Sequence, residues 1–84
     1  MDKADFTYVY RLRAINHPTQ IYTGCTTNLQ QRLHDHNRGH VPHTSKYAPW
    51  QIDVAIAFRD RKKAEVFERY LKSGSGREFA RRHF

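Results

Sequence analysis

Apolar and polar residues alternate in three segments of the chain, residues 6–13, 20–23 and 50–59. A period of two is typical of β-strands, because successive side chains of a strand point to opposite faces. The third segment is the most regular, and its apolar members are Trp50, Ile52, Val54, Ile56 and Phe58. The pattern therefore predicts three strands.

The first two strands are expected to form a hairpin. Asn16 and Pro18 lie between them and supply turn chemistry, since proline fixes φ and asparagine tolerates unusual backbone angles. If the loop is centred near Asn16, Tyr10 and Tyr22 lie close to opposite one another and share a face. Gly24 ends the second strand where the backbone must bend.

A first helix is predicted directly after this hairpin. Thr27 and Gln30 have the spacing of a capping box, with Thr27 at the N-cap position. The helix should run to about Asn37 and stop at Gly39. Residues 40–49 contain two prolines and several small polar residues, and are expected to form a loop.

Two further helices are predicted in the last third of the chain. Asp60 can cap a helix over residues 61–73, in which Glu68 falls on the apolar stripe. A carboxylate there is costly to bury unless it is paired or holds a metal ion. Ser75 and Glu78 form another capping box and start a short basic helix.

The order strand, strand, helix, strand, helix, helix predicts an α/β (α+β) fold, a three-stranded antiparallel sheet flanked by helices. With 84 residues, the chain is expected to be a single domain over residues 1–84. Its 38% hydrophobic content argues against disorder. Fifteen lysines and arginines against eight acidic residues give a net charge of +7, which favours a polyanionic partner such as nucleic acid.

The single cysteine and the short apolar runs bear on the cellular compartment. Cys25 is the single cysteine, so an intramolecular disulfide is excluded and an intracellular protein is the default. The longest apolar run, residues 54–58, is far too short to span a membrane, and residues 1–5 lack the pattern of a signal peptide. We expect a cytoplasmic monomer or weak dimer.

Two short aromatic segments are the most informative motifs. Tyr-Val-Tyr at 8–10 and Tyr-Thr-Gly at 22–24 are followed by Arg32, His36 and, far downstream, Glu68. As an ordered set they resemble the GIY-YIG endonuclease family, over most of the chain. Tyrosine replaces the first signature glycine and threonine the middle of the second segment, but neither change removes a functional side chain.

The resemblance implies a metal-dependent endonuclease that hydrolyses DNA phosphodiester bonds in repair, recombination or mobile-element contexts. Its catalytic residues would be Tyr10, Tyr22, Arg32, His36 and Glu68. The glutamate would hold Mg²⁺ or Mn²⁺, the arginine would hold the scissile phosphate, and one of the two tyrosines would take the proton of the attacking water, directly or by relay. The histidine could orient a tyrosine or protonate a phosphate oxygen. A separate protein would supply specificity.

Other interpretations stay open. Tyrosines favour strands for packing reasons alone, and Glu68 could be a buried partner of an arginine or lysine. A non-catalytic basic nucleic-acid-binding module on the same fold is the main alternative to an enzyme, and a structural protein is a third. In either nucleic-acid-binding case the expected DNA contacts are Lys46, Arg61, Lys62, Lys63, Lys72 and Arg77. The histidines at 34, 36, 40 and 43 lack zinc-like spacing.

Overall fold

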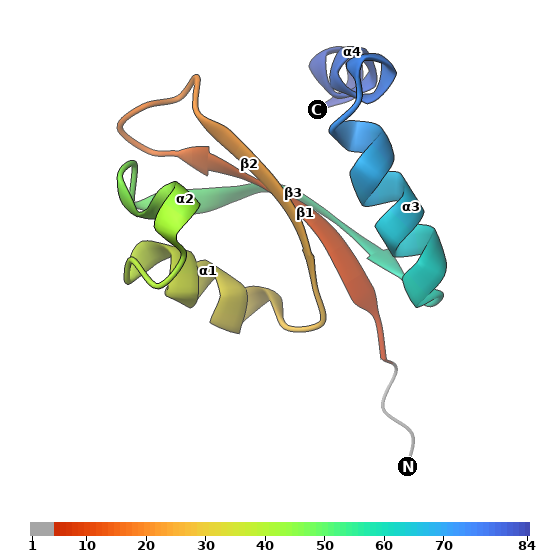
Figure 1. Cartoon of the computed structure of the whole chain (residues 1–84), viewed down its shortest axis with the longest axis horizontal. Helices are drawn as coiled ribbons and strands as arrows, with labels where there is room; N and C mark the ends of the chain where they lie inside the picture. The colour runs from red at the N-terminus through yellow and green to blue at the C-terminus, as the bar shows by residue number, and fades with distance from the viewer. Residues whose placement is uncertain (1–4) are drawn as a thin grey trace.

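The computed structural model describes residues 5–84, so most of the segment checked for a signal peptide lies outside the described residues. Three strands and four helices follow one another in the order β-β-α-α-β-α-α (Figure 1). The strands are β1 (Thr7–Ala14), β2 (Ile21–Thr26) and β3 (Trp50–Phe58). The helices are α1 (Leu29–Asn37), α2 (Pro42–Ser45), α3 (Arg61–Leu71) and α4 (Gly74–His83).

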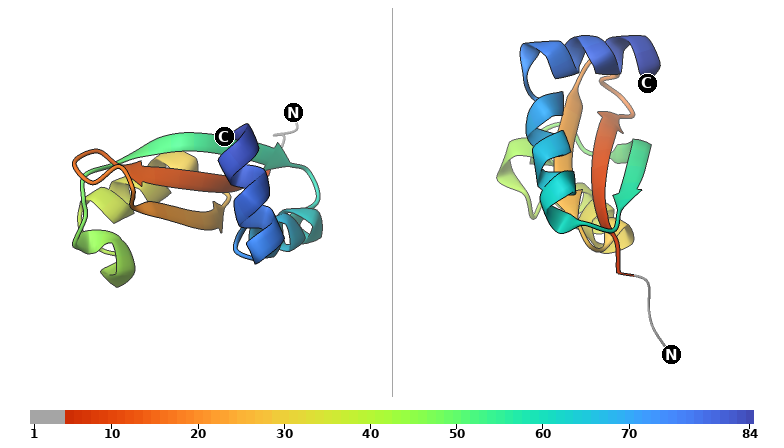
Figure 2. Two further views of the ribbon diagram at one scale, coloured as in Figure 1. Left: turned by 90° about the horizontal axis from the view of Figure 1, so that it is seen from above. Right: turned by 90° about the vertical axis from the view of Figure 1, so that its right-hand side faces the viewer.

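The predicted three-stranded antiparallel sheet is confirmed, with strand order β2-β1-β3. Its central strand alternates between two apolar clusters. Tyr10 and Leu12 pack with the α1 side chains Leu29 and Leu33, whereas Val9 packs with residues of α3 and α4. The sheet therefore separates α1 and α2 on one face from α3 and α4 on the other (Figure 2).

Strand β3 carries a β-bulge that the regular alternation did not predict. Leu12 pairs with Ile52 and Arg11 pairs with Val54, so Asp53 is the extra residue. A bulge reverses the alternation, because two residues of one strand oppose a single residue of the other. Trp50 accordingly packs beside Leu12 on the α1 side of the sheet, and Phe58 joins the cluster on the α3 side.

The predicted hairpin is confirmed, with a small correction to its register. Gly24 lies directly opposite Tyr10, and Tyr22 lies opposite Leu12. The two tyrosines share a face as expected, but on a diagonal, with ring centroids 6.1 Å apart. Diagonal neighbours on one face remain within reach of aromatic side chains.

The start of α1 differs from the predicted capping box. Asn28, not Thr27, is the N-cap, because its side chain accepts a hydrogen bond from the backbone N–H of Gln31 at 3.1 Å. The hydroxyl of Thr26 accepts from the N–H of Asn28 and fixes the turn before the helix. The expected end is confirmed, since α1 ends at Asn37 and Gly39 has φ of +78°.

The loop expected over residues 40–49 contains the short helix α2. Pro42 occupies its first turn, where the missing N–H of proline costs nothing. The indole N–H of Trp50 donates to the carbonyl of Thr44 at 2.9 Å and ties this helix to β3. The side chain of Asn37 bonds to both the N–H and the C=O of Trp50, so α1 is anchored at the same point.

Asp60 caps α3 as predicted, accepting from the N–H groups of Lys62 and Lys63. Helix α3 ends two residues earlier than expected, because Ser73, not Ser75, is the N-cap of α4 and accepts from the N–H of Gly76. A side chain at Gly76 would collide with the backbone carbonyl of Tyr70, so the close approach of α4 to α3 requires glycine there. Among residues 5–84, the helices are all too short or too polar to cross a membrane.

Candidate active site at the edge of strand β2

Tyr10 projects from the central strand β1 over the backbone of Gly24 on β2. A Cβ atom at Gly24 would lie 2.6 Å from the Tyr10 hydroxyl oxygen and 2.8 Å from Cζ, closer than real Cβ contacts. The absence of a side chain at Gly24 is therefore what allows the Tyr10 phenol to occupy this place. The segment 22–24 therefore contributes the Tyr22 ring and, at Gly24, the space that the Tyr10 ring occupies.

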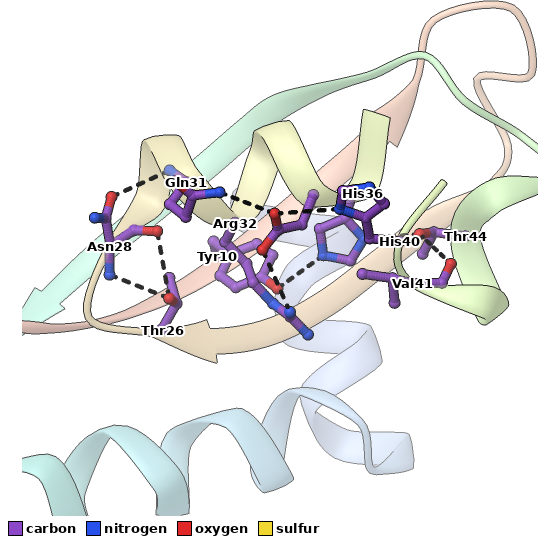
Figure 3. A network of polar contacts seen from close by, with 10 residues as sticks. Tyr10, Thr26, Asn28, Gln31, Arg32, His36, His40, Val41 and Thr44 are labelled. Carbon is purple, nitrogen blue, oxygen red and sulfur yellow. Dashed lines mark hydrogen bonds and ion pairs between the residues drawn. The ribbon is translucent and has the colours of Figure 1, made fainter. Parts of the chain in front are cut away.

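His36 of α1 lies beside the hydroxyl group of Tyr10 and is fully buried. Its Nε2 is 3.0 Å from the Tyr10 hydroxyl, and its Nδ1 is 2.7 Å from the Thr44 hydroxyl (Figure 3). The Tyr22 ring lies against it with centroids 4.7 Å apart. The histidine is therefore an interior residue, held by side chains of β1, β2 and α2.

The hydrogen bonds of Thr44 determine which nitrogen of His36 carries a proton. The Thr44 hydroxyl donates its hydrogen to the carbonyl of Val41 at 3.2 Å, so it can only accept from the imidazole. On this ground we assign the proton of the neutral ring to Nδ1, which leaves Nε2 as an acceptor for the Tyr10 hydroxyl. Burial, followed by the charge of Arg32, lowers the pKa of His36 and favours that neutral form.

The hydroxyl of Tyr10 is held in its neutral form. Burial raises its pKa to about 12, against the opposing effect of the neighbouring Arg32 guanidinium. Arg32 comes from α1, and its own pKa is raised, mainly by its contact with Tyr10. Asp35 lies 4.0 Å from the guanidinium at the helix surface. A phenol, a guanidinium and an imidazole thus meet at one point, as their order in the sequence suggested.

Glu68 lies on α3, which packs on the other face of the sheet. Its carboxylate is one of the charges that raise the pKa of Tyr10. The side chain is 20% exposed, and its Oε2 lies 2.7 Å from Nζ of Lys72 one turn along the helix. The sequence left open a buried pair with an arginine or lysine; the structure shows a lysine pair, but at the surface.

Side chains from both faces of the sheet converge around the edge of β2. A cavity of about 400 Å³ at the end of the strand is lined by Arg32 from α1 and by Arg61 and Glu65 from α3. A second cavity, of about 300 Å³, is lined by Tyr22 and by Lys72 and Arg77. Because β2 is an edge strand, side chains from helices on opposite faces of the sheet can meet beside it.

The predicted DNA contacts divide into two groups. Arg61, Lys72 and Arg77 line the cavities beside β2. Lys62 and Lys63 instead border an apolar groove on α3, and Lys46 lies over the Tyr47 ring beyond α2. The structure brings only the first group to the candidate site.

The side chains at this edge differ from the ligand set of a structural zinc site and are closer to those that bind Mg²⁺. Within residues 5–84, no group of three histidine, cysteine or acidic side chains is placed to hold a metal. A structural zinc site needs such a set, whereas Mg²⁺ keeps several waters and uses one or two carboxylates together with phosphate oxygens. Glu68 offers a single, partly exposed carboxylate of the kind that a hydrated Mg²⁺ uses, and the Lys72 ammonium contacts one of its oxygens.

Sequence analysis missed three contributors to the site: Gly24 as the place of the Tyr10 ring, Thr44 as the partner of His36, and Arg11 in the second cavity. The register of the hairpin would have identified the glycine. The other two depend on a helix inside a supposed loop and on the packing of α4, for which the sequence carries no local signal.

Phosphoryl-transfer sites use such groups, tyrosines, a guanidinium and a carboxylate, to bind the phosphate and to activate the attacking water. Comparison with protein families agrees. The model of the GIY-YIG catalytic domain matches residues 6–81, and the chain belongs to this family, which is a family of nucleases. A search of curated proteins and a search of solved structures gave no match.

Proposed function

We propose that this protein is a divalent-metal-dependent endonuclease that hydrolyses DNA phosphodiester bonds at the edge of β2. The observation that carries the proposal is the 3.0 Å contact between the Tyr10 hydroxyl and Nε2 of the buried His36, to which we assign the acceptor role. A module that only binds DNA has no need of a proton acceptor beneath a tyrosine. The net charge of +7 supports a polyanionic substrate.

Tyr10 is the proposed proton carrier. With a pKa of about 12, the phenol is ionised in only about one molecule in 10⁵ at pH 7, so a free phenolate is a poor starting point. A relay avoids this difficulty. As water attacks phosphorus, its proton passes to the Tyr10 oxygen while the tyrosine proton passes to Nε2 of His36. The imidazolium that forms has both N–H groups paired, one with Tyr10 and one with Thr44.

Arg32 and Glu68 have complementary roles in the proposal. The Arg32 guanidinium, beside Tyr10, would bind the scissile phosphate and orient it toward the attacking water. Glu68 would hold the metal, with Tyr22 packed against His36 as the remaining wall of the site. A divalent ion bound there supplies positive charge to the developing phosphorane and to the leaving oxygen.

The wider context is part of the same proposal. We place the activity in a cytoplasmic protein that is a monomer or weak dimer. A separate protein would select the cleavage site, because non-specific phosphate contacts carry no sequence information. Repair, recombination and mobile-element processes all generate the branched or nicked DNA that such an enzyme could receive.

The second candidate, a non-catalytic DNA-binding module, is favoured by the Glu68–Lys72 pair, since a paired carboxylate can be purely structural. A cleavage assay separates the two. Supercoiled, branched and single-stranded DNA are incubated with the protein in Mg²⁺, in Mn²⁺ and in chelator. We expect metal-dependent cleavage that Tyr10→Phe removes, since this change keeps the ring and deletes the hydroxyl. DNA binding without cleavage in any condition would favour the binding module.

A further inference from the structure

The cavity between β2, the end of α3 and α4 has a strongly basic lining. Arg11, Lys72 and Arg77 contribute three cations to its wall, and its lining residues include no acid. Its volume is about 300 Å³. Arg11 and Thr23, its neighbour across the β1–β2 pair, form the floor on the α3 face of the sheet, opposite the face of Tyr10.

Arg11 is the unusual member of this lining. Its side chain is only 14% exposed, and its guanidinium is 3.7 Å from the nearest oxygen of Asp53, beyond hydrogen-bonding distance. Asp53 accepts its hydrogen bonds from Arg13 instead, at 3.3 and 3.4 Å. The guanidinium carbon Cζ lies over the Phe84 ring, 5.5 Å from its centroid. Within residues 5–84, the Arg11 guanidinium has an ion pair but no hydrogen bond.

The free N–H donors of this mostly buried guanidinium are not sealed from solvent, so a phosphate oxygen can reach them by displacing water. Burial lowers the pKa of Arg11, because the charged guanidinium has lost part of its hydration. Guanidinium groups present several N–H donors in a planar fork that matches phosphate oxygens. Lys72 and Arg77 add two more cations on the opposite wall, on flexible and exposed side chains.

We propose that this cavity, which we name the Arg11 pocket, binds one backbone phosphate of the DNA strand, next to the scissile phosphate. The inference rests on the proposed function. Lys72 links the two positions, because it lines the pocket and also contacts the Glu68 carboxylate at 2.7 Å. A single strand lying along the edge of β2 would therefore place one phosphate near Arg32 and Glu68 and a neighbouring one in the pocket.

The test measures binding without cleavage, so its outcome is independent of catalysis. Fluorescence anisotropy of a labelled DNA duplex is recorded in chelator over a range of salt concentrations. We expect Arg77→Gln to weaken binding about fivefold or more and to reduce the salt slope by about one. Arg82→Gln is the matched control, an exposed arginine of the same helix outside the pocket, and should stay within about twofold of wild type.

Arg11→Met keeps the apolar stem of the floor residue and should weaken binding to a similar degree, with a thermal melt to show that the protein is folded. Inorganic phosphate serves as competitor. Displacement of DNA by phosphate only at high, salt-like concentrations supports a backbone phosphate as the occupant. Tight binding of free phosphate, or folded Arg77→Gln and Arg11→Met proteins that bind DNA like the Arg82→Gln control, would overturn the proposal even if the protein cleaves DNA.

Discussion

His36 accepts a hydrogen bond from Tyr10 because Thr44 occupies its other ring nitrogen. The Tyr10 contact is 3.0 Å and the Thr44 contact is 2.7 Å, and both lie in a fully buried part of the protein. Thr44 is in turn fixed by the indole of Trp50, which binds its carbonyl. Residues from β1, α1, α2 and β3 thus determine the direction of the hydrogen bond between Tyr10 and His36.

The first prediction concerns Thr44. Thr44→Val keeps the shape of the side chain but removes the acceptor for Nδ1–H, so His36 can turn its proton toward Tyr10. We expect single-turnover cleavage to fall about 10- to 100-fold, within the range for loss of general-base assistance. The buried N–H left unpaired should cost about 1–3 kcal/mol of stability.

Thr44→Ser restores the hydroxyl and should recover most of the rate. Nitrogen-15 NMR of His36 reports the tautomer directly, which a purely structural effect would not change. A Thr44→Val protein that cleaves like wild type, with its tautomer unchanged, would contradict the assignment.

The second prediction concerns pH. The pKa of His36 in the folded protein is below its ordinary value of 6.5, so between these two values the unfolded chain binds a proton that the folded protein does not. The contribution of His36 to the free energy of unfolding is therefore fully present above about pH 6.5 and is lost as the pH falls toward the folded pKa. Thermal melts of wild type and His36→Gln over pH 5 to 8 should differ in slope below pH 6.5. Parallel curves would show that His36 is not the group responsible.

The third prediction concerns Gly24. Gly24→Ala places a methyl group where the Tyr10 hydroxyl lies, so the phenol must leave its bond to His36. We expect a loss of about 1–3 kcal/mol in stability and at least a tenfold loss of cleavage. Gly74→Ala is the control, because nothing lies within 4 Å of the added atom.

The fourth prediction concerns the Glu68–Lys72 pair. Lys72 is about half exposed, so breaking the pair should change stability by less than about 1 kcal/mol. Glu68→Gln is expected to abolish cleavage, leave folding intact and bind DNA as tightly as wild type or more tightly. Lys72→Met frees the carboxylate and should tighten Mn²⁺ binding in the absence of DNA, measured by calorimetry. An active Glu68→Gln enzyme would rule out Glu68 as the metal ligand.

The sequence predicted the strands and three of the four helices because these elements are encoded locally. Asp60 shows this well, since a cap residue before an apolar stripe is sufficient to start α3. Local rules fail where two residues qualify for one role. Thr27 and Asn28 are both good caps, and the choice depends on Thr26, whose hydroxyl holds the N–H of Asn28.

For the candidate site, the ordered motif indicated which side chains would meet at β2, and the structure brings Tyr10, Arg32 and His36 together there. The motif could not indicate burial or direction. That His36 is an acceptor depends on Thr44, and the pocket floor at Arg11 depends on α4 folding back over the sheet. Both are tertiary effects without a local pattern.

The bulge at Asp53 also affects how the protein behaves among its own copies. In the described part of the chain β3 pairs with β1 alone, so its other side presents unpaired backbone groups, a template on which a strand of a second molecule could add. The extra residue interrupts that template, and its carboxylate is held by Arg13. Deleting Asp53 would straighten this edge while Leu12 stays opposite Ile52 and Arg11 stays opposite Val54, so the core would be kept and the regular edge restored. The irregularity therefore protects the molecule from aggregation at the edge opposite its site.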